Sequence, residues 1–215
     1  NITAFELTGT LANDRLALKG DIGVVARPEL VAWLNARSDQ FNGRLVAGVP
    51  VTLTINRAAT ATTGFDPSAT TLDARLTVQP GSLIGDEQIG DMSWQTITAT
   101  VNTPTNLARG LRLELIETPL TVRGETGRIA ANADLANLFD PAGEPTFEKL
   151  TVNGEAHVEG LPPALVDLIA DLDGIAVAAI DGPIDLDATF KGAADGEQTF
   201  TLTADAAKIG RASCR

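Results

Sequence analysis

Apolar and polar residues alternate along almost the whole chain. This period-two pattern is typical of β-strands that bury one face. Phe5 and Leu7, followed by Leu16 and Leu18 beyond an Asn-Asp turn, predict a hairpin. The alternation recurs over residues 49–55, 72–78, 97–101, 111–115, 120–122, 129–135, 150–158, 184–190 and 200–204. Because short turns join most of these segments, we expect a mainly β fold, a long antiparallel sheet of about ten or more strands.

Two stretches change to the period of a helix. Residues 28–34 begin with a proline at a first-turn position and place Leu30, Val31 and Leu34 on one face. Residues 162–174 repeat this design, and Gly174 is suited to end the helix. The sequence therefore predicts two short amphipathic helices beside the sheet.

The two helical stretches belong to a longer pattern that recurs. Residues 28–31 match residues 163–166, and residues 50–53 match residues 183–186 at nearly the same spacing. Chance similarity between two helix starts is the alternative explanation. Ordered matches favour an internal repeat and an extendable sheet. The predicted units are 20–56 and 154–190.

The charge of the chain excludes some partners. It holds 28 acidic and 16 basic residues, for a formal net charge of −12. Nucleic-acid binding and adhesion to an anionic membrane surface both need clustered basic residues, so we expect neither. No apolar run reaches the roughly 18 residues of a membrane-spanning helix. Placed on the alternating pattern, the acidic residues form the solvated outer face of the sheet.

The last residues, 208–215, break from this pattern. Three of the eight are basic, and the strand alternation stops. Their sequence resembles a translated sequencing adapter, and an ordinary basic tail is the alternative. We interpret 1–207 as the repetitive β-rich region and 208–215 as a non-native tail. The only cysteine, Cys214, lies in that tail, so cysteine content says nothing about the redox compartment. The chain opens in mid-pattern without Met, which suggests a fragment of a longer protein.

Few residues offer catalytic chemistry. His157 is the only histidine, and its neighbours predict that it points to the polar face of a strand. Asp185 and Asp187, like Asp181, share one face, where two carboxylates could in principle act as acid and base. A solvated acidic outer face explains them without extra assumptions and is the favoured interpretation. The segment 171–174 lacks the closing Glu of an EF-hand calcium loop, and 81–85 is not a nucleophile elbow. We expect no catalytic residues, no metal and no cofactor.

The apolar face is the remaining candidate surface. It either closes into an ordinary core or stays open as a groove for acyl chains. The inward residues that would line the groove are Leu53, Ile55, Leu76, Val78, Leu113, Leu115, Val152, Leu186, Phe190 and Leu202. Alanines on the same face would leave volume for a ligand or permit close sheet packing.

Most of residues 1–207 resemble the bacterial AsmA-like proteins, which include the TamB-type and YhdP-type envelope proteins. The resemblance depends on the Thr- and Asp-rich alternating strands and on the segments 154–162 and 182–190. It implies a long curled sheet, taco-like in section, with a hydrophobic groove in the periplasm. It also implies an inner-membrane anchor outside this fragment and a part in phospholipid transport or outer-membrane homeostasis.

We therefore expect a non-enzymatic periplasmic segment that binds phospholipid acyl chains, with the rest of the same chain as its other partner. The alternative is a secreted or surface β-sandwich with a structural or adhesive function, in which two sheets pack about 10 Å apart. A third possibility is a hydrolytic β-domain that uses Asp185 and Asp187.

Overall fold

The computed structural model describes residues 2–29, 32, 43–85, 90–140, 142–146, 148–161, 183–193, 196 and 198–206. In this part of the chain, 13 strands form one sheet in which every pairing is antiparallel. The strands are β1 (Ile2–Ala12), β2 (Arg15–Ala26), β3 (Arg44–Leu45), β4 (Val49–Ala61), β5 (Thr71–Val78), β6 (Gly81–Ile84), β7 (Asp91–Trp94), β8 (Ile97–Asn102), β9 (Leu111–Val122), β10 (Glu125–Ala136), β11 (Thr151–Leu161), β12 (Ile184–Ala193) and β13 (Gln198–Ala206).

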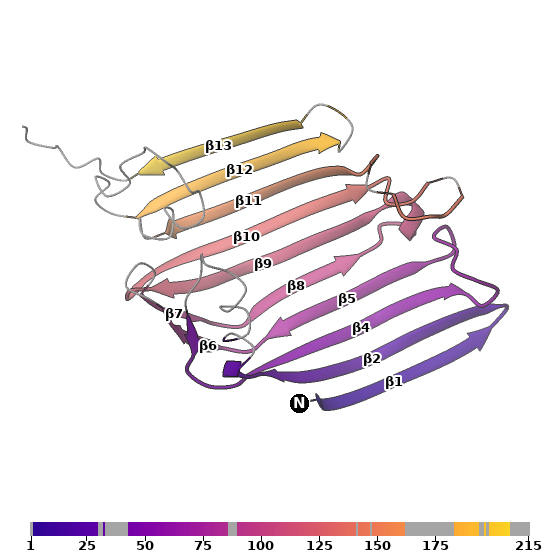
Figure 1. The fold of residues 1–215 in the computed structure, drawn as a ribbon, viewed down its shortest axis with the longest axis horizontal. Coiled ribbons are helices and arrows are strands. Elements are labelled where there is room, and N and C mark those ends of the chain that lie inside the picture. The colour runs from indigo at the N-terminus through magenta and orange to yellow at the C-terminus, as the bar shows by residue number, and fades with distance from the viewer. Residues whose placement is uncertain are drawn as a thin grey trace, which may run out of the picture.

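The main strands follow the order β1-β2-β4-β5-β8-β9-β10-β11-β12-β13, so neighbours along the chain are almost always neighbours in space. They lie in a single layer with β1 at one edge and β13 at the other (Figure 1). The sheet does not close on itself, because β1 and β13 do not pair. The predicted mainly β, antiparallel and open sheet is confirmed. Two sheets packed face to face, as the sandwich alternative requires, do not occur among the described residues.

Tight turns explain why consecutive strands pair. Asn13 and Asp14 both have positive φ, at 49° and 56°, and join β1 to β2. Arg123 and Gly124 do the same between β9 and β10, at 52° and 84°. Two successive residues with positive φ match the right-handed twist of the flanking strands. The hairpin predicted around Asn13-Asp14 is therefore confirmed.

Two-residue bulges interrupt three pairings on the main path. Asn56 and Arg57 lie opposite Lys19, Ile116 and Glu117 lie opposite Ala130, and Glu159 and Gly160 lie opposite Asp185. A bulge bends its strand and increases the local twist.

The two ends of the sheet differ. At one end, β3 pairs with β6, β6 with β7, and β7 with β9. Leu45, Val49 and Leu83 form a small buried core there, beside Trp94. A Cβ added at Gly81 would lie 2.5 Å from the Trp94 ring, so this packing needs glycine.

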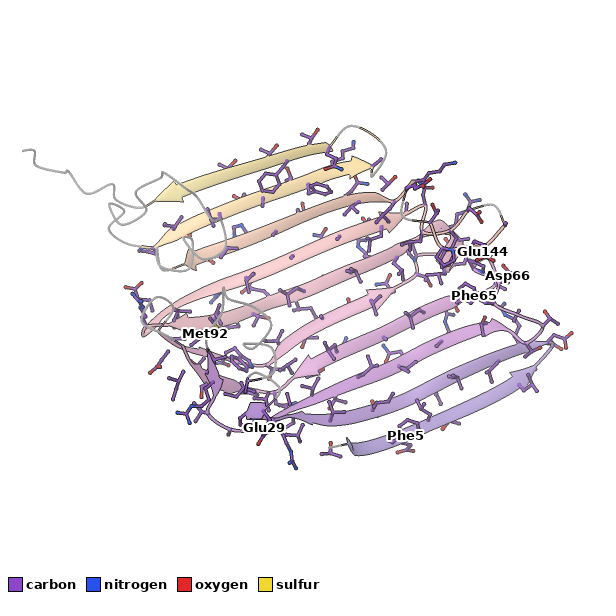
Figure 2. All side chains as sticks on the ribbon, in the orientation of Figure 1. Phe5, Glu29, Phe65, Asp66, Met92 and Glu144 are labelled. Carbon is purple, nitrogen blue, oxygen red and sulfur yellow. The ribbon has the colours of Figure 1, made fainter. Side chains whose placement is uncertain are left out.

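At the other end, loops gather around Phe65, Asp66 and Glu144 (Figure 2). The ring of Phe65 lies 5.5 Å from that of Phe139. Arg15 donates a hydrogen bond to the carbonyl oxygen of Ala69 at 2.6 Å, which connects this end to β2.

The two predicted amphipathic helices are not borne out. Only Pro28, Glu29 and Ala32 of the first are helical and described, and all of 162–174 lies outside the described residues. The only complete helical element in the described ranges is a 3-10 turn, η1 (Leu107–Arg109). Its Asn106 side chain accepts a hydrogen bond from the Arg109 backbone N–H at 3.1 Å. Proline at the start of a helix sets one φ angle but does not supply the contacts that stabilise a short helix.

The predicted repeat units each supply two adjacent antiparallel strands. These are β2 with β4 from 20–56, and β11 with β12 from 154–190. The repeat itself stays a prediction, and the 208–215 tail lies outside the described residues.

Candidate functional site

One face of the sheet is lined by apolar residues that stand opposite one another across ten strands. The central row contains only apolar residues: Phe5, Ile22, Leu53, Leu76, Ala99, Leu115, Ala131, Ala156, Ala188 and Leu202. Side chains two residues apart on a strand point to the same side of a sheet. We call this surface the apolar face.

The predicted groove-lining residues all occupy register positions on the apolar face. Leu53, Leu76, Leu115 and Leu202 belong to the central row. The next row holds Leu7, Gly20, Ile55, Ala74, Val101, Leu113, Ala133, Gly154, Phe190 and Phe200. The remaining three pair with further apolar-face residues: Val78 with Val51, Val152 with Leu135, and Leu186 with Val158.

Much of the apolar face remains open. Leu76 and Leu113 are each 40% exposed, whereas Ile184 is 1% exposed and Leu186 is 8% exposed. A hollow of about 500 Å³ lies at the centre of the face. Its apolar lining consists of Leu53, Leu76, Ala99, Val101, Leu113, Leu115, Ala131 and Ala133, which come from β4, β5, β8, β9 and β10. Binding sites for small molecules span about 300–1,000 Å³, so the hollow has the size of such a site.

The opposite side, which we call the polar face, is built from the residues between these rows. The row next to the central one contains only polar residues: Glu6, Asp21, Thr54, Arg75, Thr100, Glu114, Asn132, Glu155, Thr189 and Thr201. Thr54 donates a hydrogen bond to Asp21 at 2.6 Å, and Asn132 donates one to Glu155 at 2.6 Å.

A second hollow, of about 280 Å³, lies on the polar face where the Ile116-Glu117 bulge opposes Ala130. His157 and Asp187 line it from directly opposite positions on β11 and β12. The His157 Nδ1 and Asp187 Oδ1 atoms lie 2.7 Å apart. This hydrogen bond raises the pKa of His157, and the negative charges of Asp187, Glu159 and Asp185 add to the effect.

The structure places His157 on the polar face, as predicted. The two aspartates have different hydrogen-bond partners. Asp187 is held by His157, while Asp185 accepts a hydrogen bond from the Gly160 backbone N–H at 2.7 Å. Asp185 therefore binds the backbone of a bulge, and Asp181 lies outside the described residues.

The other candidates offer no further site. Residues 171–174 lie outside the described residues, and 81–84 form strand β6. In the described ranges, no group of three His, Cys, Asp or Glu side chains is arranged to hold a metal ion. No helix among these residues has the length and apolar character needed to cross a membrane.

The alternating pattern did not predict the bulges. The hollows on the polar face lie beside these bulges. A second such hollow contains Lys19, Asp21 and Asn56, beside the bulge in β4. A local signal for these bulges exists, because Asn56-Arg57 and Glu159-Gly160 each put two non-apolar residues in succession inside an alternating strand. No family model, curated protein or solved structure matches this chain.

Proposed function

We propose that this chain is a non-enzymatic, lipid-binding segment of an AsmA-like envelope protein in the periplasm. Phospholipid acyl chains lie on the apolar face, while their headgroups stay in water. The segment serves lipid transport or outer-membrane homeostasis as part of a longer chain with an inner-membrane anchor. The observation that carries the proposal is the 500 Å³ hollow, which is lined by eight aliphatic residues on a half-exposed face.

The dimensions of the hollow suit an acyl chain that crosses the strands. The hollow reaches from β4 to β10, five adjacent strands. Strands lie about 4.8 Å apart, so its length is about 19 Å. One leaflet of a bilayer contributes about half of a hydrocarbon core about 30 Å thick, so an extended lipid tail fits this length. Each methylene buried there contributes about 0.8 kcal/mol.

The experiment compares two neighbouring alanines on β10. Ala131 lines the hollow in the apolar face, whereas Ala130 faces His157 across the polar face. A carboxylate at position 131 would have to be desolvated under an acyl chain, which is costly. Phospholipid extracted from the purified protein and measured by mass spectrometry is expected to fall at least fivefold in Ala131→Asp.

The matched variant, Ala130→Asp, is expected to retain the wild-type amount of lipid. Identical lipid-free spectra from native and delipidated wild-type protein would contradict the proposal and favour a structural or adhesive function. Loss of lipid from both variants would place the binding elsewhere.

A further inference from the structure

The tripeptide Phe-Asp-Pro occurs twice in the chain, at residues 65–67 and 139–141. The first copy lies in the loop between β4 and β5, and the second lies in the loop between β10 and β11. In the first copy, the Asp66 Oδ1 atom accepts a hydrogen bond from the Ser68 backbone N–H at 2.8 Å. The Asp66 carbonyl oxygen accepts one from the Ala69 backbone N–H at 3.1 Å. Asp66 therefore fixes the turn that follows it.

The second copy makes the same turn. The Asp140 Oδ1 atom accepts a hydrogen bond from the Ala142 backbone N–H at 2.8 Å, and the Asp140 carbonyl oxygen accepts one from Gly143 at 3.0 Å. Oδ1 also accepts a hydrogen bond from the Glu144 backbone N–H at 2.9 Å. Aspartate favours turns in which its side chain binds the backbone two residues ahead. Each Phe-Asp-Pro loop is therefore held by its own aspartate, directly after its phenylalanine.

The two loops contact each other through their phenylalanines. The ring centroids of Phe65 and Phe139 lie 5.5 Å apart and the rings are tilted by 50°, which is within the geometry that aromatic pairs prefer. A Cβ built on Gly143 would lie 3.4 Å from the Cδ atom of Pro67, so the second loop packs against the first there as well. Phe65 is 61% exposed at this end of the sheet (Figure 2), so the ring pair is not part of a buried core.

This contact joins strands that are not neighbours. β5 and β10 are separated in the sheet by β8 and β9. The first loop also holds η1, the turn between β8 and β9. The Pro67 carbonyl oxygen accepts a hydrogen bond from the Ala108 backbone N–H at 3.0 Å, and the Thr70 carbonyl oxygen accepts one from Leu107 at 2.8 Å. The strands that the contact spans, together with β4, are those that line the 500 Å³ hollow.

A contact between distant strands limits how far an open sheet can flex. Neighbouring strands are twisted relative to each other by about 20–25°, with a wide range, so small changes at each pair add up across several strands. The hydrogen bonds of the sheet connect only neighbours. The contact between Phe65 and Phe139 spans all the pairs from β5 to β10, so it restricts the sum of these changes.

We propose that the two Phe-Asp-Pro loops couple the β4–β5 hairpin to the β10–β11 hairpin and thereby fix the curvature of the sheet around the hollow. The ring pair of Phe65 and Phe139 is the coupling contact. Asp66 and Asp140 hold the two rings in position. The inference does not depend on lipid binding, because it concerns the shape of the sheet itself.

Spin labels at Arg57→Cys and Asn153→Cys, in a Cys214→Ser background, measure this curvature. Both residues are exposed and belong to one row on the polar face, so the line between them crosses the sheet. They lie five strand spacings apart, or about 24 Å. Pulsed electron paramagnetic resonance is expected to give one narrow distance distribution for the labelled chain. The distribution is expected to become at least twice as wide in Phe65→Ala.

Further variants separate this coupling from a local effect. Phe139→Ala and the double variant Phe65→Ala/Phe139→Ala are expected to match Phe65→Ala, because loss of either ring removes the same contact. The matched control is Phe5→Ala, since Phe5 on β1 is 65% exposed and lies outside the two loops. This variant is expected to leave the distribution unchanged. Circular dichroism checks that each variant retains its strands. Should Phe65→Ala lose them, Asp140→Ala is expected to widen the distribution instead.

Three results would overturn the proposal. One is an unchanged distribution in a folded Phe65→Ala variant, since the hairpins would then keep their positions without the ring pair. The second is a double variant whose widening is the sum of the two single effects, because the two rings would then act separately. The third is equal widening in Phe5→Ala, because the loss of any exposed ring would then loosen the sheet.

Discussion

The two faces of the sheet differ in the contacts that their side chains make: polar side chains bind one another on one face, and apolar side chains remain partly exposed on the other. On the polar face, Thr54 and Asn132 donate to the carboxylates of Asp21 and Glu155, and His157 pairs with Asp187. On the apolar face, the row directly beside these residues has no polar side chain, and Leu76 and Leu113 are 40% exposed. The polar face satisfies its own groups in water, whereas the apolar face retains a cost of hydration that a ligand or partner would remove.

The comparison also shows that the apolar face is not uniform. Ile184 and Val122 are 1% and 0% exposed, so they are packed as in a closed core. The residues around the hollow are not packed in this way. Stability and binding are therefore expected to depend on different parts of one face, and this separation can be tested.

The largest expected effect is on stability at a buried position. Ile184→Ala removes a fully buried side chain and is expected to lower the free energy of unfolding by about 3 kcal/mol. Leu113→Ala, at a 40% exposed position, is expected to cost about 1 kcal/mol, because much less area is removed from contact. Urea unfolding followed by circular dichroism measures both. Equal losses would show that the rim of the hollow is packed as tightly as Ile184.

The alternation in the sequence was sufficient to predict the sheet and its two faces. All ten predicted lining residues occupy register positions on one face, because the side-chain period of a strand is two and neighbouring strands pair antiparallel. Alternation does not report where a strand gains a residue, so the bulge at Ile116-Glu117 and the hollow beside it were not predicted.

Short elements were also missed, for a related reason. β3, β6 and β7 have two to four residues, too few to show a period. They are stabilised by contacts between distant residues, such as Leu45 with Leu83, which no local pattern contains. The two predicted helices are not borne out in the described residues, where only Pro28, Glu29 and Ala32 of the first are helical and 162–174 is not described.

A smaller effect is expected on the binding of a neutral dye. Leu76 and Leu113 face the hollow, while Arg75 and Arg112 are their neighbours on the polar face. The double variant Leu76→Thr/Leu113→Thr is expected to lower the native-state fluorescence of Nile red at least threefold, because the dye binds exposed apolar surface. The matched Arg75→Thr/Arg112→Thr variant is expected to leave it unchanged. A similar loss in both variants would show that the dye does not distinguish the faces.

The smallest expected effect concerns the one histidine on the polar face. The hydrogen bond to Asp187 raises the pKa of His157 above its ordinary value of 6.5. The protonated form is thus favoured in the folded chain, so its contribution to stability is full below about pH 6.5 and is lost as the pH rises through the raised pKa. Both side chains are more than half exposed, so the change in stability is small and the pKa is the better measurement.

Proton NMR can follow this titration without assignment, because the chain has a single histidine. Asp187→Asn is expected to lower the pKa of His157 toward 6.5, while the Asp185 and Glu159 carboxylates keep it from falling the whole way. Asp73→Asn, on the polar face of β5, is the control and is expected to leave the pKa unchanged. An unchanged pKa in Asp187→Asn would mean that the 2.7 Å pair does not persist in solution. In that case, the hydrogen bonds that Thr54 and Asn132 donate on the polar face would remain. The ion pair between His157 and Asp187 would not.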